Sequence, residues 1–137
     1  MLTIVYPVML SFEHPEEIVA TFQDVPEAIT SGATREEALA NAADALATAV
    51  NGYLLAGRPV PQPSQSGHSK VALEPAIAAR VLLAATMAKE HLTKVALAER
   101  LGIDEKTVRR MLTGRSVSLD RVLAALKALG VRPALAV

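Results

Sequence analysis

The residues with the clearest capacity for chemistry lie on one short predicted helix in the second half of the chain, Glu105–Leu112. Apolar residues recur along it at helical spacing and predict a buried face. The opposite face carries the polar residues Glu105, Lys106, Thr107, Arg109 and Arg110. Arg and Lys side chains can pair with guanine O6 and N7 in the major groove of duplex DNA, where a good bidentate pair contributes about 1–3 kcal/mol of discrimination. This face is therefore a candidate reader of base edges.

Three further polar residues flank this helix in the sequence. Lys94 begins the preceding predicted helix, and Arg115 and Ser116 lie in the following loop. Side chains of these types bond phosphate oxygens and so fix how a protein sits on a duplex. From Lys94 to Arg121 there are seven bases and four acids, a modest positive excess. The segment therefore suits docking on duplex DNA, and a purely structural dimerisation unit is the alternative interpretation.

The turn between the two helices has its own sequence signals. Thr93 and Asp104 each precede a helical pattern and are predicted N-caps, because their side-chain oxygens can accept from the unpaired amides of the first turn. Gly102 permits a left-handed turn, and Ile103 is predicted to fill the core between the helices. The same kinds of signal predict helices at Pro75 to about His91, Lys94–Leu101, Glu105–Leu112 and Leu119–Leu129. This arrangement is typical of a helix-turn-helix of the Cro/repressor type.

The first 57 residues predict a small sheet with one helix laid on it. Pro7 argues that the first strand lies at a sheet edge or contains a bulge, because proline has no amide hydrogen to donate. Thr34 followed by Glu37 is a capping box, which begins a helix of about twenty residues that ends before Gly57. β-branched and aromatic residues predict strands at Leu2–Phe12, Ile18–Gln23 and Ala28–Ser31, with a possible fourth at Lys70–Leu73.

A segment rich in proline and serine separates the two halves. Residues 57–69 read GRPVPQPSQSGHS, a composition that is typical of an extended linker. We therefore predict a first domain at 1–57, a linker at 58–69 and a second domain at 70–137. The expected fold class is α+β, with a β-β-β-α(-β) N-terminal domain joined to an all-α helix-turn-helix domain. The apolar tail, residues 131–137, is predicted to add a short strand.

The formal net charge of zero hides an imbalance between the halves. Residues 1–57 contain eight acids and one base, whereas residues 58–137 contain six acids and thirteen bases. Such an asymmetry indicates two modules with different partners. An acidic module can steer association with a basic protein, and a basic one suits nucleic acid. The alternative is that the charges only keep each half in solution.

The sequence lacks the patterns of a catalytic or metal site. There is no cysteine, which excludes disulfides, thiolate metal sites and a cysteine nucleophile. His14, His68 and His91 share no metal-ligand spacing, and no glycine-rich phosphate loop is present. We therefore expect no enzyme activity, no cofactor and no metal. No apolar run approaches about 18 residues, the length of a membrane span. No signal peptide is visible either, so a cytoplasmic location is expected.

Several short motifs follow one another in a fixed order along the chain. Tyr6-Pro7-Val8 is followed by DVP at 24–26, TSGATREEAL at 30–39 and RPVPQPS at 58–64. Together with the helix-turn-helix, this ordered set resembles the HicB antitoxin family, in the branch that carries a C-terminal helix-turn-helix. The resemblance covers nearly the whole chain.

The resemblance implies a function as well as a fold. It implies a partial RNase H-like N-terminal domain that neutralises a HicA-like toxin, an mRNA-cleaving ribonuclease, by direct binding in a type II toxin–antitoxin pair. It also implies that a homodimer or higher homo-oligomer represses its own operon. In the acidic domain we expect Asp24 and Glu27 to face the toxin. The alternatives are a stand-alone transcriptional repressor, which senses a small ligand or acts without a toxin partner, and a degenerate nuclease.

Overall fold

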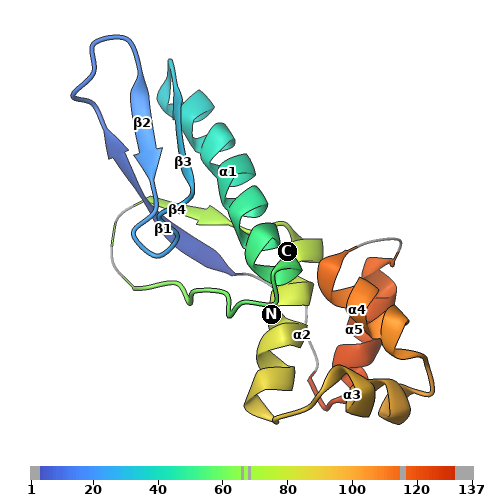
Figure 1. The fold of residues 1–137 in the computed structure, drawn as a ribbon. Coiled ribbons are helices and arrows are strands. Elements are labelled where there is room, and N and C mark those ends of the chain that lie inside the picture. Colours follow the sequence, from blue (N-terminus) through green and yellow to red (C-terminus); the bar gives the residue numbers. More distant parts are fainter. Residues whose placement is uncertain (1–3, 66, 68, 115–116, 132–137) are drawn as a thin grey trace.

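Within the residues that the computed structural model describes (4–65, 67, 69–114 and 117–131), a four-stranded sheet and a long helix occupy one end of the molecule. Four shorter helices of the described chain occupy the other end (Figure 1). The first part consists of β1 (Val5–Ser11), β2 (Ile18–Thr21), β3 (Ile29–Gly32), α1 (Arg35–Leu55) and β4 (Ser69–Ala72). The second part consists of α2 (Pro75–Lys89), α3 (Lys94–Leu101), α4 (Glu105–Thr113) and α5 (Leu119–Ala128). The expected α+β architecture is confirmed.

The sheet is antiparallel, in the order β3-β2-β1-β4. The prediction that Pro7 places its strand at an edge is wrong, because β1 is a central strand. However, β1 pairs with β4 over residues 5–8 and with β2 only over residues 9–11. Pro7 therefore has a neighbouring strand on one side only, which is the local environment that proline tolerates.

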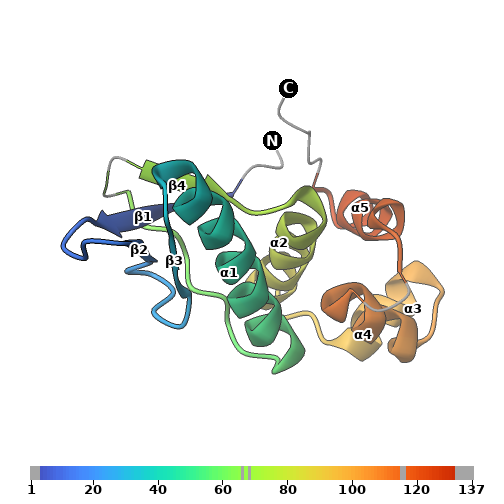
Figure 2. The same cartoon turned by 90° about the horizontal axis from the view of Figure 1, so that it is seen from above.

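Helix α1 lies across one face of the sheet (Figure 2). Its predicted N-cap, Thr34, is confirmed, because it accepts from the amide of Glu37. The Glu37 carboxylate accepts in return from the amide of Ala33, one residue before the N-cap position of the capping box. A Cβ on Gly32 of β3 would lie 2.4 Å from the amide nitrogen of Ala38, so only glycine lets the helix approach this strand so closely. The residues buried on the helix are Ala38, Ala42, Leu46, Val50 and Leu54.

The predicted linker is packed against the N-terminal half. After α1 it runs back along the lower end of the sheet as an extended segment and enters β4 (Figure 1). The Tyr6 hydroxyl donates to the carbonyl of Pro61 at 2.6 Å. The Asp24 carboxylate accepts from the amide and the hydroxyl of Ser64, at 2.9 and 3.0 Å. The possible fourth strand is confirmed, and it joins the N-terminal sheet, although the predicted division placed residues 70–73 in the second domain.

The predicted helices of the C-terminal half are confirmed, with small shifts at their ends. α2 begins at Pro75, whose missing amide hydrogen costs nothing in a first turn. It ends at Lys89, two residues before the predicted end near His91. There the backbone turns left-handed, with φ 52° at His91, and the amide of Leu92 bonds the carbonyl of Met87.

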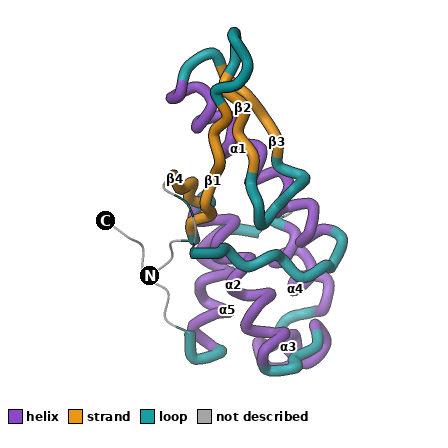
Figure 3. The backbone as a smooth tube through the Cα atoms, turned by 90° about the vertical axis from the view of Figure 1, so that its left-hand side faces the viewer, coloured by secondary structure: helices purple, strands orange, loops and turns teal. Residues whose placement is uncertain are grey.

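Figure 3 shows the sheet at one end of the backbone and α2 to α5 at the other, and one apolar core runs through both halves. α2 lies at its centre, because it packs on α1 on one side and on α4 and α5 on the other. Leu46 of α1, Leu83 of α2 and Leu126 of α5 are fully buried in this core. The two halves therefore form one packed body, and the helix-turn-helix has a fixed position relative to the sheet.

No helix in the described part of the chain is long and apolar enough to cross a membrane. The partial RNase H-like character of the sheet and the division into domains stay predictions. The expected strand in the apolar tail lies, from residue 132 onward, outside the described residues. The predicted start of the first strand, residues 2–3, lies outside them as well.

Candidate nucleic-acid interface

Side-chain caps fix the turn between α3 and α4. Thr93 Oγ1 accepts from the amide of Ala96 at 3.0 Å. Asp104 Oδ1 accepts from both the amide and the hydroxyl of Thr107, each at 2.7 Å. Gly102 takes the left-handed conformation that the sequence predicts, with φ 69°. The caps and the turn together set the angle between the two helices, so the predicted helix-turn-helix is confirmed.

The Asp104 carboxylate is stabilised in its ionised form. Its pKa is lowered first by the bond from the Thr107 hydroxyl, then by the bond from the Thr107 amide, and also by the charges of Arg110 and Lys106. A negative charge here faces the unpaired amides at the start of α4, where the helix dipole favours an anion. The cap is therefore coupled electrostatically to two cations of the outward face.

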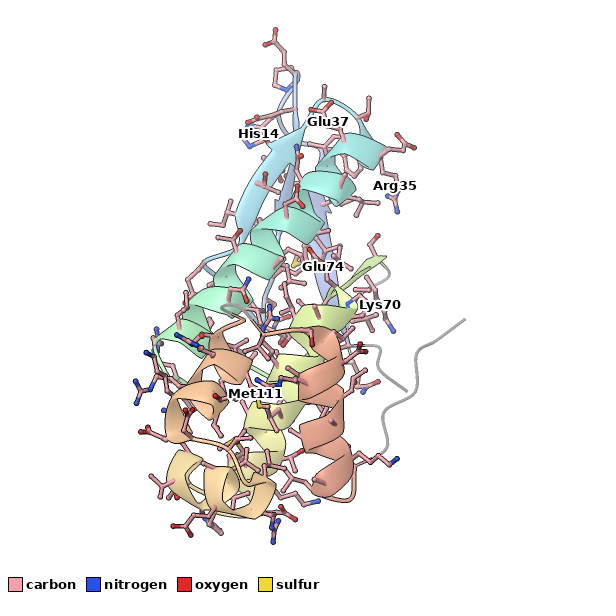
Figure 4. The ribbon with its side chains drawn as sticks, turned by 90° about the vertical axis from the view of Figure 1, so that its right-hand side faces the viewer. His14, Arg35, Glu37, Lys70, Glu74 and Met111 are labelled. Carbon is pink, nitrogen blue, oxygen red and sulfur yellow. The ribbon has the colours of Figure 1, made fainter. Side chains whose placement is uncertain are left out.

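The outward face of α4 is dominated by two exposed cations, Lys106 and Arg110. They lie one turn apart, opposite the buried residues Val108, Met111 and Leu112. Figure 4 shows Met111 among the helices of this half. Neither cation forms an ion pair within the described residues. Both side chains are therefore available to base edges or phosphates.

The other predicted DNA contacts have different surroundings. Arg109 is exposed, but it bonds Glu105 at 2.8 Å, one turn earlier on the same helix. Thr107 uses its hydroxyl in the cap of α4. Lys94 is exposed in the first turn of α3. A contact of Arg109 with DNA would therefore require the loss of its bond to Glu105, whereas Lys94 has no ion-pair partner to lose among the described residues.

Arg80 of α2 is a polar residue that the sequence analysis did not select. Its guanidinium lies under the turn that ends α4, since a Cβ on Gly114 would lie 2.7 Å from its Cζ. Within the described chain its Nε is buried without a hydrogen-bond partner. Burial lowers the pKa of Arg80, and Glu74 opposes this shift. No local motif marks such a residue, because only the tertiary fold places it there. The predicted phosphate contacts Arg115 and Ser116 lie outside the described residues.

The two expected toxin contacts are engaged within the chain. Asp24 holds Ser64 of the linker. Glu27 accepts from the Tyr53 hydroxyl at 2.5 Å, and the Arg58 guanidinium lies 4.8 Å from the centre of the Tyr53 ring. The hydrogen bond between Glu27 and Tyr53 lowers the pKa of Glu27 and raises the pKa of Tyr53. Both carboxylates therefore tie the β2–β3 loop to the end of α1 and the linker.

The face of the sheet away from α1 carries exposed apolar side chains. Met9 and Ile29 are each 63% exposed, and Phe12, just after β1, is 62% exposed. The strand register places Met9 beside Thr21 and Thr21 beside Ile29, so the two apolar side chains lie in one row across three strands. Thr21 lies between them in this row, and exposed apolar side chains that share one face make that face a candidate partner site. The sequence alone does not reveal this surface, because alternation separates the two faces of a strand without indicating which face the helix covers.

Comparison with known proteins covers both halves of the chain. The family described as the HicB-like antitoxin of bacterial toxin–antitoxin systems matches residues 5–84, and a helix-turn-helix family matches residues 83–135. This chain belongs to the HicB-like antitoxin family. Antitoxin HicB 2 of Photorhabdus laumondii is 43% identical over an alignment of 127 residues that covers 91% of this chain and 90% of that protein. Antitoxin HicB of Escherichia coli strain K12 is 33% identical over an alignment of 128 residues that covers 91% of this chain and 93% of that protein.

The chain is therefore a HicB-like antitoxin with a DNA-binding helix-turn-helix, as the ordered motifs predicted. The family assignment indicates a regulatory protein that acts by binding. Among the described residues, no group of three or more His, Cys, Asp or Glu side chains could hold a metal ion. His14 lies at the end of the antitoxin domain that points away from the helix-turn-helix (Figure 4).

Proposed function

We propose that this chain is the antitoxin of a type II toxin–antitoxin pair, that it neutralises a HicA-like mRNA-cleaving toxin by direct binding, and that it represses its own operon. The observation that carries the proposal is one packed body in which a HicB-like domain is joined to a helix-turn-helix. The outward cations of that helix-turn-helix have no ion-pair partner among the described residues. An antitoxin that bound only its toxin would need no such face.

On DNA, α4 enters the major groove and the start of α3 lies against the sugar-phosphate backbone. A homodimer places two such helices on inverted half-sites about one helical turn, or a multiple of it, apart. The base-edge candidates are Glu105, Lys106, Thr107, Arg109 and Arg110, and the phosphate candidates are Lys94, Arg115 and Ser116.

For the toxin we propose the outer face of the sheet, around Met9 and Ile29. The exposed apolar row supports this choice, because burying it against a partner removes apolar surface from water. The eight acids of residues 1–57 steer a basic toxin toward the same domain. Asp24 and Glu27 stay proposed contacts at its margin, since a carboxylate with one internal partner still has lone pairs for another.

The toxin part is tested by co-expression with any small open reading frame that lies beside the gene, followed by size-exclusion chromatography and a growth assay. We expect a stoichiometric complex and full rescue of growth. The double variant Met9→Asp with Ile29→Asp should lose both. The matched control is Val95→Asp, which changes an apolar residue that is 55% exposed on α3. Equal loss in both variants would contradict the proposed surface.

The DNA part is tested by retardation of the chain's own promoter DNA. Arg110→Ala should lose sequence preference more than it loses non-specific affinity, because a base contact discriminates and a phosphate contact does not. Lys89→Gln, an exposed cation at the end of α2, is the control. A uniform loss across sequences would remove the base-reading role of Arg110. A chain that binds its promoter but no toxin would be a stand-alone repressor.

A further inference from the structure

A half-open cavity of about 950 Å³ lies where the antitoxin domain meets the helix-turn-helix. Its walls come from the start of β1, the end of α1, the linker, one side of α2 and the flank of α4. Aliphatic side chains such as Ile4, Val81, Leu82 and Leu112 line much of it. Sites for small organic molecules typically measure about 300–1,000 Å³ and lie at domain junctions. Neither toxin neutralisation nor base reading accounts for such a space.

The charged side chains in the lining are all cations. They are Arg58, Lys70, Lys94 and Arg109, and no carboxylate belongs to the described lining. The charge composition of the lining therefore differs from that of the whole chain, which has fourteen acids and fourteen bases. Lys70 and Lys94 have no ion-pair partner within the described residues. Arg109 bonds Glu105 in an exposed pair, and such pairs contribute little in water. Apolar walls ringed by cations fit an anion with an apolar body.

The linker wall of the cavity is already ordered. Prolines at three alternate positions, Pro59, Pro61 and Pro63, belong to it, and each has its own φ fixed by its ring. The Tyr6 hydroxyl holds the carbonyl of Pro61, and Asp24 holds the segment that follows. Burial, and then the charge of Asp24, raises the pKa of Tyr6 to about 12, which agrees with an apolar wall at this point. A wall ordered in advance lowers the entropic cost of binding.

We propose that this cavity binds a small organic anion with an apolar body, such as a medium-chain carboxylate. The apolar part lies against α2 and the linker prolines, and the charged group pairs with the lining cations. Binding forms and breaks no covalent bond.

The cavity and the DNA surface share two side chains. Lys94 and Arg109 line the cavity, and both belong to the residues proposed to contact DNA, so this step rests on the proposed function. An anion that pairs with either cation competes with DNA for it. By linkage, the ligand lowers the affinity for DNA, and DNA lowers the affinity for the ligand by the same factor. A small molecule could thus release the operator without any change in toxin level.

The first test uses the full chain without DNA or toxin, and sodium decanoate below its micelle concentration as the probe. Methyl NMR follows Val81, Leu82 and Leu112 in the cavity and Val19 on the outer face of the sheet. We expect saturable shifts of the cavity methyl groups only. Decyltrimethylammonium, with the same chain and the opposite charge, should bind at least about tenfold more weakly. Equal shifts at Val19, or equal affinity for the two probes, would overturn the proposal.

Two variants locate the binding. Ala85→Phe places a large side chain in the cavity from an exposed position of α2, and it should abolish saturable decanoate binding. Lys70→Gln should weaken binding about three- to fivefold, because it removes one partly solvated charge. Lys89→Gln lies outside the lining and should leave binding unchanged. Thermal unfolding verifies that each variant is folded. Wild-type decanoate affinity in folded Ala85→Phe would show that the cavity is not the site.

A second measurement tests the regulatory link. Saturating decanoate should weaken promoter binding by the wild-type chain about five- to tenfold, and it should have no effect on the Ala85→Phe variant. Unchanged promoter affinity at saturation would overturn the link between the two sites. A chain that binds no promoter DNA at all would contradict the proposed function instead, and the NMR titration would still decide whether the cavity is a ligand site.

Discussion

The two halves of this antitoxin are held in shape by different kinds of contact. In the helix-turn-helix half, three helices begin at a side-chain cap that bonds an amide three residues later. In the sheet half, the deciding hydrogen bonds join distant positions. Asp24 and Ser64 are 40 positions apart, and Tyr6 and Pro61 are 55 apart. The helix-turn-helix half is specified mainly by neighbours in sequence, whereas the sheet half, apart from the local cap of α1, also depends on neighbours that only folding creates.

This difference predicts different sensitivity to mutation. Losing one cap costs about 1 kcal/mol and acts first on one helix. A substitution that separates α1 from the sheet removes many contacts at once, because side chains along the whole interface are closely packed. The sheet half should therefore contain the single positions with the largest effects.

The largest effect is expected from Gly32→Ala. The new Cβ would meet the backbone of Ala38 at 2.4 Å, and backbone cannot move aside as a side chain can. We expect the free energy of unfolding to fall by at least about 2 kcal/mol, measured by urea denaturation. The control is Gly52→Ala, an exposed helical position where a Cβ meets nothing within 4 Å. It should stabilise the chain by about 0.5–1 kcal/mol. Equal effects at the two glycines would refute the close layer contact.

The second effect is expected at the linker. Asp24→Ala removes the acceptor of two bonds from Ser64, so the linker should be held less firmly around this residue, while Tyr6 still bonds Pro61. We expect a loss of about 1 kcal/mol in the free energy of unfolding and faster amide exchange and proteolysis in residues 58–65. Asp44→Ala, an exposed acid of α1, is the matched control. Unchanged protection of the linker amides would show that Asp24 does not anchor it.

The third effect is a pH dependence of stability that comes from a local cap in the helix-turn-helix half. The pKa of Asp104 lies below its ordinary value of 3.8 in the folded chain, so its cap stabilises the fold above that value. This contribution is lost as pH falls through the lowered pKa. The thermal midpoint of the wild type should therefore drop more between pH 7 and pH 3 than that of Asp104→Asn, which keeps a cap that does not titrate. Glu99→Gln, in α3, is the control. Identical pH profiles for wild type and Asp104→Asn would contradict the assignment.

The smallest effect is a shift in the titration of Tyr6, measured by absorbance, and it reports on the sheet half. Tyr53→Phe leaves Tyr6 as the sole tyrosine of the chain. Its phenolate absorbance should appear with a pKa of about 12 instead of the ordinary 10.0, because of burial and the charge of Asp24. The raised pKa stabilises the fold below pH 10, and this stabilisation is lost as pH rises through 12. Adding Asp24→Ala should lower the pKa toward 10. A value of 10 before that change would mean that the linker does not bury this side chain.

The sequence by itself determined the helix-turn-helix. Thr93, Gly102 and Asp104 act on backbone groups within three or four positions, so cap, turn and helix length can be read from adjacent letters. The capping box of α1 was readable for the same reason. The ordered motifs likewise indicated the family, because their order is a property of the chain and not of its fold.

Only the tertiary structure decided the rest. It made β1 central despite Pro7, gave Asp24 and Glu27 partners inside the chain, and placed Arg80 under the turn at Gly114. It also formed a half-open cavity between two halves that the sequence separates by a linker. These features depend on which distant segments share a layer, and that choice is set by the total apolar surface buried in the common core. Local patterns limit the possible layers, but packing selects among them.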